Sequence, residues 1–158
     1  MGDEEAKKNE ALQIIAQYTP LPRLFVFDLD YTLWPLYCEF NEDDDKPRLY
    51  AESSLVLHAL KDKGIDLAVA SRTPTPKVAS AFLKTLAIDS IFLAKEIHKK
   101  TGVPFTSMLF FDDEDRNIRA VSKMGATCIL VENGVNLGAL RQGLMKFSQT
   151  LTQVVIYI

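Results

Sequence analysis

Two carboxylates one residue apart follow an apolar run, and this spacing suits phosphate chemistry. The run covers residues 24–27, and the carboxylates belong to Asp28 and Asp30. Such a run predicts a buried strand, and open α/β sheets bind their ligands at the carboxyl ends of their strands. Two like charges this close are unfavourable unless a cation lies beside them or one carries a proton. We therefore expect a site for a divalent metal ion that handles phosphate.

Polar side chains also follow two later apolar runs of the chain. Ser71 comes after residues 65–70, and Asp112 and Asp113 come after residues 108–111. The carboxyl ends of parallel strands meet at one edge of a sheet, so we expect these side chains to lie near Asp28 and Asp30. A D-x-D pair alone is weak support for a site, and D-x-D-x-T directly after an apolar strand is better support. Polar residues after three strands make the support strong.

These residue types suit phosphoryl transfer through a covalent intermediate. We expect Asp28 to attack phosphorus, and Asp30 to protonate the leaving oxygen and then activate the hydrolytic water. Mg²⁺ prefers oxygen ligands and keeps part of its water shell. Its predicted protein ligands are Asp28, the backbone carbonyl of Asp30, and a carboxylate of Asp112 or Asp113.

The phosphate oxygens need donors, and three positions can supply them. We expect the Ser71 hydroxyl to donate to the phosphate, with backbone N–H groups near Leu29 and Arg72 as further donors. The Arg72 side chain is also close enough along the chain to touch a substrate. Each polar residue has a structural alternative, because Ser71 can cap the turn that follows and one of the two adjacent aspartates can cap the next helix.

Two aromatic residues after the carboxylate pair also have two possible roles. Trp34 and Tyr37 can line the mouth of a substrate site, or they can pack beneath the loop that contains them. Pro35 lies between them, and this composition predicts an irregular segment or a short hairpin rather than a helix.

Strand and helix patterns alternate along the chain, which predicts a parallel sheet with helices on both faces. The expected fold class is therefore a three-layer, Rossmann-like α/β fold. The expected strands cover residues 24–27, 65–70, 88–93, 108–111 and 127–131, and the expected helices cover 53–63, 77–86, 117–124 and 137–147.

The length of 158 residues suits one domain with short extensions at both ends. Residues 1–21 are expected to form a peripheral helix, because a helical apolar pattern stops before Pro20 and Pro22. The domain itself is expected at residues 22–148. Residues 149–158 are expected to form an apolar tail with strand propensity.

Composition excludes several classes of protein. The net charge is −3 and there is no stripe of Lys and Arg, so a nucleic-acid partner is not expected. There is no apolar run long enough to cross a bilayer, and the acidic start is unlike a targeting peptide, so we expect a cytoplasmic protein without a membrane partner. Cys38 and Cys128 lack the spacing of a disulfide framework or a zinc site. The oligomeric state is not predicted.

Three parts of the chain resemble motifs of the haloacid dehalogenase superfamily of phosphohydrolases. Residues 28–32 resemble its first motif, Ser71 its second, and Asp112 with Asp113 its fourth. More narrowly, residues 28–35, 70–73 and 110–118 resemble the magnesium-dependent phosphatase family, and the likeness covers about residues 22–140. This resemblance implies a minimal cap, Mg²⁺ and an aspartyl-phosphate intermediate. It also implies that the substrate is phosphotyrosine or a phosphorylated small molecule such as a sugar phosphate.

The chain departs from the family pattern at the third motif, where the family has a lysine that balances charge on the nucleophile and phosphate. The interval between residues 93 and 108 is short, and the segment that would hold this lysine is missing. Lys95 can substitute, with Lys99 and Lys100 as second choices, or all three can be surface lysines.

Two functions from different classes follow from these observations. The preferred one is a Mg²⁺-dependent phosphatase that hydrolyses phosphomonoesters. The alternative is a variant that binds metal, phosphate or a partner without efficient turnover, because its third motif is shortened. A receiver domain is disfavoured, since such domains place the acid pair after the first strand and the phosphorylated aspartate later.

Overall fold

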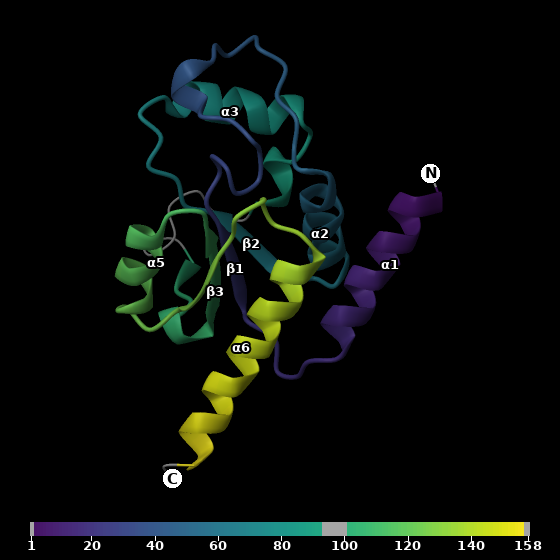
Figure 1. The fold of residues 1–158 in the computed structure, drawn as a ribbon, viewed down its shortest axis with the longest axis vertical. Helices are drawn as coiled ribbons and strands as arrows, with labels where there is room; N and C mark the ends of the chain where they lie inside the picture. The colour runs from purple at the N-terminus through teal and green to yellow at the C-terminus, as the bar shows by residue number, and fades with distance from the viewer. Residues whose placement is uncertain (1, 93–100, 157–158) are drawn as a thin grey trace.

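The computed structural model describes residues 2–92 and 101–156, with side chains described as far as residue 150. Four parallel strands form one sheet in the order β2-β1-β3-β4 (Figure 1). The strands are β1 (Leu24–Phe27), β2 (Asp66–Val69), β3 (Met108–Asp112) and β4 (Thr127–Leu130). Phe27 is in register with Val69 on one side and with Phe111 on the other, so β1 is an interior strand.

Helices cover both faces of the sheet and make three layers. Helices α1 (Gly2–Ala16), α2 (Ala51–Asp62) and α6 (Leu137–Ile156) lie on one side, and α5 (Asp115–Ser122) lies on the other (Figure 1). Because side chains alternate along a strand, Phe25 and Phe27 enter the core under the first group of helices, whereas Val26 enters the core under α5. The predicted fold class is therefore confirmed.

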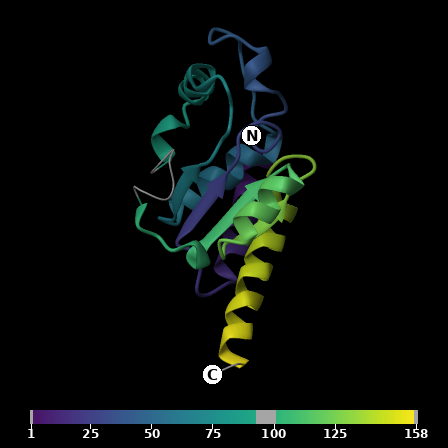
Figure 2. The same cartoon turned by 90° about the vertical axis from the view of Figure 1, so that its left-hand side faces the viewer.

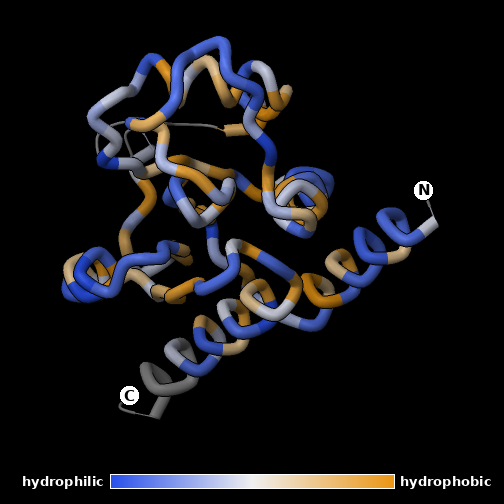
Figure 3. The backbone as a smooth tube through the Cα atoms, turned by 45° about the horizontal axis from the view of Figure 1, so that its top comes forward, coloured by the Kyte–Doolittle hydropathy of each residue, from blue (hydrophilic) through white to orange (hydrophobic). Residues whose placement is uncertain are grey.

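Helix α1 packs on the sheet side that α2 and α6 share. Its residues Ala11, Ile14 and Ile15 are buried in the larger core cluster. The view coloured by hydropathy shows hydrophilic and hydrophobic turns in both α1 and α6, as expected of helices with one face in a core (Figure 3). The predicted boundary between residues 1–21 and the domain stays a prediction.

A small lobe lies beyond the carboxyl ends of the strands. It contains α3 (Pro76–Thr85) and the short 3₁₀ turn η1 (Cys38–Phe40), which lie together at the top of both ribbon views (Figures 1 and 2). The segment between β1 and α2 has no other helix or strand than η1. This lobe is the part of the fold that faces the carboxyl ends of the strands.

The predicted strand at residues 88–93 is wrong for the part that the structure describes. Residues Asp89–Ile91 form the 3₁₀ turn η2 after α3. Helix α3 ends with Ala87 in the left-handed region at φ 58°, and Ile88 N donates to Leu83 O at 3.0 Å. This is a Schellman cap, which usually contains glycine or asparagine. The helix ends within one residue of the predicted position, and a 3₁₀ turn rather than a strand follows it. Ile88 and Phe92 are buried, and they give this stretch the apolar pattern of a strand. A short apolar run does not distinguish a strand from another buried segment.

The predicted strand propensity of the C-terminal tail is also not realised. Helix α6 continues to Ile156, through most of residues 149–158. Extension of an existing helix adds one hydrogen bond per residue without a new nucleation cost, and this outweighs a weak local propensity. The lower part of α6 extends beyond the body of the protein (Figure 2).

Among the described residues, no helix combines the length and apolar character that are needed to cross a membrane. The predicted cytoplasmic location stays a prediction.

Candidate active site

Asp28 directly follows β1 and is held from two sides. Its backbone N–H donates to Phe111 O at 3.0 Å, which fixes it to the end of β3. The hydroxyl of Thr32, which is fully buried, donates to Asp28 Oδ2 at 3.2 Å. The D-x-D-x-T segment therefore folds back on itself, and its threonine orients the first aspartate.

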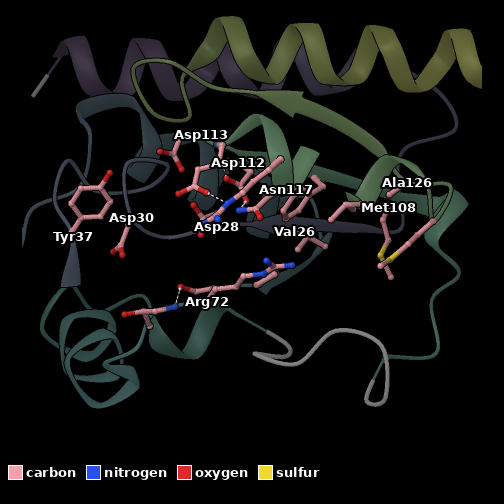
Figure 4. A pocket seen from close by; sticks show the side chains of 18 of the residues that line it. Val26, Asp28, Asp30, Tyr37, Arg72, Met108, Asp112, Asp113, Asn117 and Ala126 are labelled. Carbon is pink, nitrogen blue, oxygen red and sulfur yellow. Dashed lines mark hydrogen bonds and ion pairs between the residues drawn. The ribbon is translucent and has the colours of Figure 1, made fainter. Parts of the chain in front are cut away.

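Three carboxylates converge beside the end of β1. Oxygen atoms of Asp28, Asp112 and Asp113 all lie within 4.8 Å of one another, and the close-up shows these side chains grouped at one end of a pocket (Figure 4). Asp112 is buried and accepts hydrogen bonds from Glu114 N at 2.9 Å and from Asn117 Nδ2 at 3.0 Å. These bonds fix the Asp112 carboxylate toward Asp28.

The electrostatics of this cluster disfavour ionised carboxylates unless a cation lies beside them. Burial, followed by the charge of Asp112, raises the pKa of Asp28 from 3.8 to about 9. Burial also raises the pKa of Asp112 to about 6, against the opposing hydrogen bonds from Glu114 and Asn117. Both pKa values are raised because burial disfavours the charged form of each carboxyl group and because neighbouring carboxylates repel one another.

The donor set fits a divalent metal ion. Three carboxylates supply the hard oxygen ligands that Mg²⁺ prefers. In addition, Oδ1 of Asn117 is buried and has no hydrogen-bond partner among the described residues. An unpartnered buried acceptor beside acidic ligands is suited to a metal-bound water.

Asp30 lies near this cluster but does not belong to it. Its Oδ1 accepts hydrogen bonds from Trp34 Nε1 at 2.8 Å and from the Cys38 backbone N–H at 3.2 Å. Asp30 and Asp28 therefore have different environments, one polar and fixed by N–H donors, the other crowded by carboxylates. The predicted contact between a metal and the Asp30 carbonyl stays a prediction.

The end of β2 places Ser71 and Arg72 on the same pocket. Ala70 N donates to Phe27 O at 2.9 Å, which brings the residues after β2 next to Asp28. Ser71 Oγ accepts a hydrogen bond from Thr73 N at 3.2 Å, as in the predicted capping alternative, and its own proton stays available for donation. The Arg72 side chain extends across the pocket below Asp28 and Val26 in the close-up (Figure 4).

The pocket has a volume of about 730 Å³ and two chemically different ends. The polar end contains the three carboxylates, Asp30 and Ser71. The other end is lined by apolar side chains from the α5 side of the sheet, which are Val26, Phe105, Met108, Phe110, Val121, Met124 and Ala126.

Comparison with known proteins decides the family. The model of the acid phosphatase family matches residues 40–96 and 91–150. Human magnesium-dependent phosphatase 1 is 40% identical, and the match covers 84% of this chain and 90% of that protein. The chain belongs to the magnesium-dependent phosphatase family.

Solved structures place this family member in the haloacid dehalogenase fold. A haloacid dehalogenase superfamily hydrolase from Ehrlichia chaffeensis superposes with a TM-score of 0.61 at 13% identity, covering 81% of this chain and 98% of that one. The 3-deoxy-D-manno-octulosonate 8-phosphate phosphatase of Moraxella catarrhalis, solved with magnesium and phosphate, gives 0.51 at 21% identity and covers 92% and 98%. At these identities the likeness concerns the fold.

The family match also bears on the predicted shortening of the third motif. The two matched parts overlap at residues 91–96, at the start of the interval between residues 93 and 108 where the sequence predicts a missing segment. Lys95, Lys99 and Lys100, the candidate replacements for the family lysine, lie outside the described residues. Their predicted role stays a prediction.

Among the predicted site residues in the described chain, Asp28, Asp112 and Asp113 come together, and Asp30, Ser71 and Arg72 line the same pocket. Trp34 packs with 0% exposure, whereas Tyr37 lines the pocket. The sequence did not identify Asn117 as a site residue. Its place in the first turn of the helix after the two aspartates is the sequence signal that could have identified it.

Proposed function

We propose that this family member is a Mg²⁺-dependent phosphatase that hydrolyses phosphomonoesters through an aspartyl-phosphate intermediate. The observation that supports it best is the convergence of three carboxylates, within 4.8 Å of one another, beside the end of the central strand. Ser71 and Arg72 on the neighbouring strand end provide phosphate donors on the same pocket.

In the first step, an Asp28 oxygen attacks phosphorus and the bond from phosphorus to the leaving oxygen breaks, while Asp30 gives its proton to that oxygen. In the second step, water attacks phosphorus and gives a proton to Asp30, and the bond between phosphorus and Asp28 breaks. Inorganic phosphate leaves, and both aspartates return to their starting states. Thr32 keeps the attacking carboxylate oriented through its 3.2 Å hydrogen bond.

Asp28, Asp112 and Asp113 would hold the magnesium ion, with the Asp30 carbonyl as the further predicted ligand. Bound there, Mg²⁺ neutralises the carboxylates and supports a negatively charged phosphate. The Ser71 hydroxyl and the backbone N–H groups of Leu29 and Arg72 would bind the phosphate oxygens.

A cation from the protein is expected as well, because one Mg²⁺ ion does not balance the charge of three carboxylates and a phosphate. Arg72 and Arg116 line the pocket, and Arg116 is paired with Glu114 at 2.7 Å. We therefore assign phosphate binding to the Arg72 side chain as well as to its backbone. Lys95 is the proposed second cation, in place of the family lysine.

The proposed substrates are phosphotyrosine and phosphorylated small molecules such as sugar phosphates. The apolar end of the pocket favours a substrate whose leaving group is apolar over a sugar phosphate. Comparison of phosphotyrosine with a hexose phosphate, by their kcat/KM values, tests this order.

The decisive experiment is hydrolysis of p-nitrophenyl phosphate with Mg²⁺ and with EDTA, by the wild-type protein and by Asp28→Asn. We expect EDTA and the substitution each to abolish turnover. Asp66→Asn is the control, because Asp66 is an exposed aspartate at the start of β2. Turnover that persists in EDTA, or in Asp28→Asn at the wild-type rate, contradicts the proposed mechanism.

The shortened third motif supports a second candidate, a protein that binds metal and phosphate without efficient turnover. Loss of one cation near the phosphate would reduce the rate by about 10²–10³-fold. Calorimetric binding of Mg²⁺ and of a phosphate analogue such as orthovanadate, without hydrolysis of any phosphomonoester, would favour this candidate.

A further inference from the structure

One oxygen of the Asp30 carboxylate receives two N–H donors. Trp34 Nε1 lies 2.8 Å from Oδ1, and the backbone N of Cys38 lies 3.2 Å from the same atom. A carboxylate oxygen has two lone-pair directions, so these donors fill both of them on Oδ1. Oδ2 is therefore the atom of Asp30 that can carry a transferable proton.

The indole is held rigidly in this position. Trp34 has 0% exposure, and its ring meets the ring of Phe82 on α3 edge to face, with centroids 5.6 Å apart and planes at 82°. The backbone closes the same loop, because Tyr31 N donates to Trp34 O at 2.7 Å and Leu33 N donates to Leu29 O at 2.9 Å. A buried donor with a fixed ring orients its acceptor more sharply than a flexible surface group does.

We infer that Trp34 is a positioning residue for Asp30, holding Oδ1 through its indole N–H so that Oδ2 is presented to the leaving-group oxygen. This inference rests on the proposed function, in which Asp30 is the general acid and base. It adds a residue whose nitrogen touches neither substrate nor metal, and it makes the packing of α3 on Trp34 part of the catalytic geometry.

A positioning role for Trp34 predicts a dependence on the leaving group that a merely structural tryptophan would not produce. Protonation of the leaving oxygen matters most for esters of weakly acidic alcohols, and least for p-nitrophenol, which leaves readily as an anion. A misoriented Asp30 therefore slows hydrolysis of an alkyl phosphate or phenyl phosphate more than hydrolysis of p-nitrophenyl phosphate. General loss of packing lowers the rates for all three substrates by a similar factor.

The composition of the chain permits a precise change at this position. Trp34 is the single tryptophan, so growth on 3-benzothienylalanine replaces its N–H by sulfur at this residue alone, with little change in ring shape. Trp34→Phe is the second variant, and Ile14→Val in the buried face of α1 is the control for loss of packing. Circular dichroism melts show which proteins are folded at the assay temperature.

We expect both Trp34 variants to lose about 10–10²-fold in kcat/KM for phenyl phosphate and alkyl phosphate, and much less for p-nitrophenyl phosphate. Ile14→Val changes the three substrates alike. An equal loss for all three substrates in the benzothienyl protein, or no loss for any of them, overturns the inference.

Asp30→Asn separates this inference from the proposed function. If Asp30→Asn shows the strong dependence on the leaving group and the benzothienyl protein does not, the role of Asp30 stands and that of Trp34 is wrong. If Asp30→Asn itself shows no such dependence, the proposed acid and base role of Asp30 fails, and the inference about Trp34 fails with it.

Discussion

The side-chain amide of Asn117 donates from Nδ2 to Oδ2 of Asp112 at 3.0 Å, while its Oδ1 is buried without a partner in the described part of the chain. A buried acceptor without a donor is unfavourable by about 1–3 kcal/mol. Because Asn117 Nδ2 contacts Asp112, one of the three clustered carboxylates, we expect Oδ1 to accept a hydrogen bond from a water bound to the proposed metal ion.

Asn117→Ala is expected to weaken Mg²⁺ binding by about 10–100-fold, because it removes both the support of Asp112 and the acceptor for a metal-bound water. Isothermal titration with MgCl₂ measures the change. Gln142→Ala is the control, because Gln142 is exposed on α6. Equal Mg²⁺ affinity in Asn117→Ala and the wild type would exclude this role.

The metal-free protein is expected to lose stability as the pH rises. In the folded state the pKa of Asp28 is about 9 instead of 3.8, so the folded protein binds more protons than the unfolded chain between these values. The free energy of unfolding therefore falls as the pH rises through this window. Melting in EDTA from about pH 5 to about pH 8 measures the fall.

Two controls accompany the pH series. Saturating Mg²⁺ binds the ionised carboxylates and should remove most of the fall. Asp28→Asn should flatten the curve in EDTA, since the pKa of Asp28 is raised to about 9 and that of Asp112 only to about 6. A melting temperature that rises with pH in EDTA would contradict the expected sign.

Arg72→Met is expected to lower kcat/KM for a phosphomonoester by about 10²-fold, the effect of removing one charged donor from the phosphate. Arg116→Met is the matched control, since Arg116 lines the same pocket but is paired with Glu114 at 2.7 Å. Lys95→Met should be measured in parallel. A larger loss in Lys95→Met than in Arg72→Met would make Lys95 the principal cation.

Gly134→Ala is expected to destabilise the protein by more than Gly64→Ala. Both glycines have a left-handed backbone, with φ of 75° and 73°, so alanine at either position costs about 1–3 kcal/mol in strain. At Gly134 a Cβ atom would also run into the ring of Tyr50, whereas at Gly64 there is open space. Urea unfolding of both variants measures the difference, and equal midpoints would show that Tyr50 moves aside.

The parallel sheet could be predicted because its strands are apolar runs that end in polar residues. For example, β3 (Met108–Asp112) is an apolar run that ends in Asp112 and is followed by Asp113, so one pattern identifies both an element and a site. The predicted strand at 88–93 failed because its short apolar run belongs, over Asp89–Ile91, to a 3₁₀ turn. The apolar side chains of Ile88 and Phe92 are buried in the observed structure, as they would be in a strand. An apolar pattern therefore did not distinguish a strand from a 3₁₀ turn.

The candidate site could be predicted only in part, because some of its contacts depend on how a loop folds. Residue type and position after a strand indicate Asp28, Ser71 and Asp112, because the fold brings strand ends together. The partners of Asp30 depend on how residues 30–38 turn, with Tyr31 in the left-handed region at φ 55°. A sequence that contains tyrosine there gives no signal for such a turn, so the bond from Trp34 was not foreseen.

The interior position of β1 has a consequence for how the site fluctuates. Asp28 N is bonded to Phe111 O at 3.0 Å beside a strand that is paired on both edges, so its amide hydrogen should exchange with solvent only when most of the sheet opens. The backbone amides of residues 71–75 follow the edge strand β2 and should exchange through local openings. Asp28 would then stay fixed on slow timescales, while residues 71–75, on the other side of the pocket, open locally.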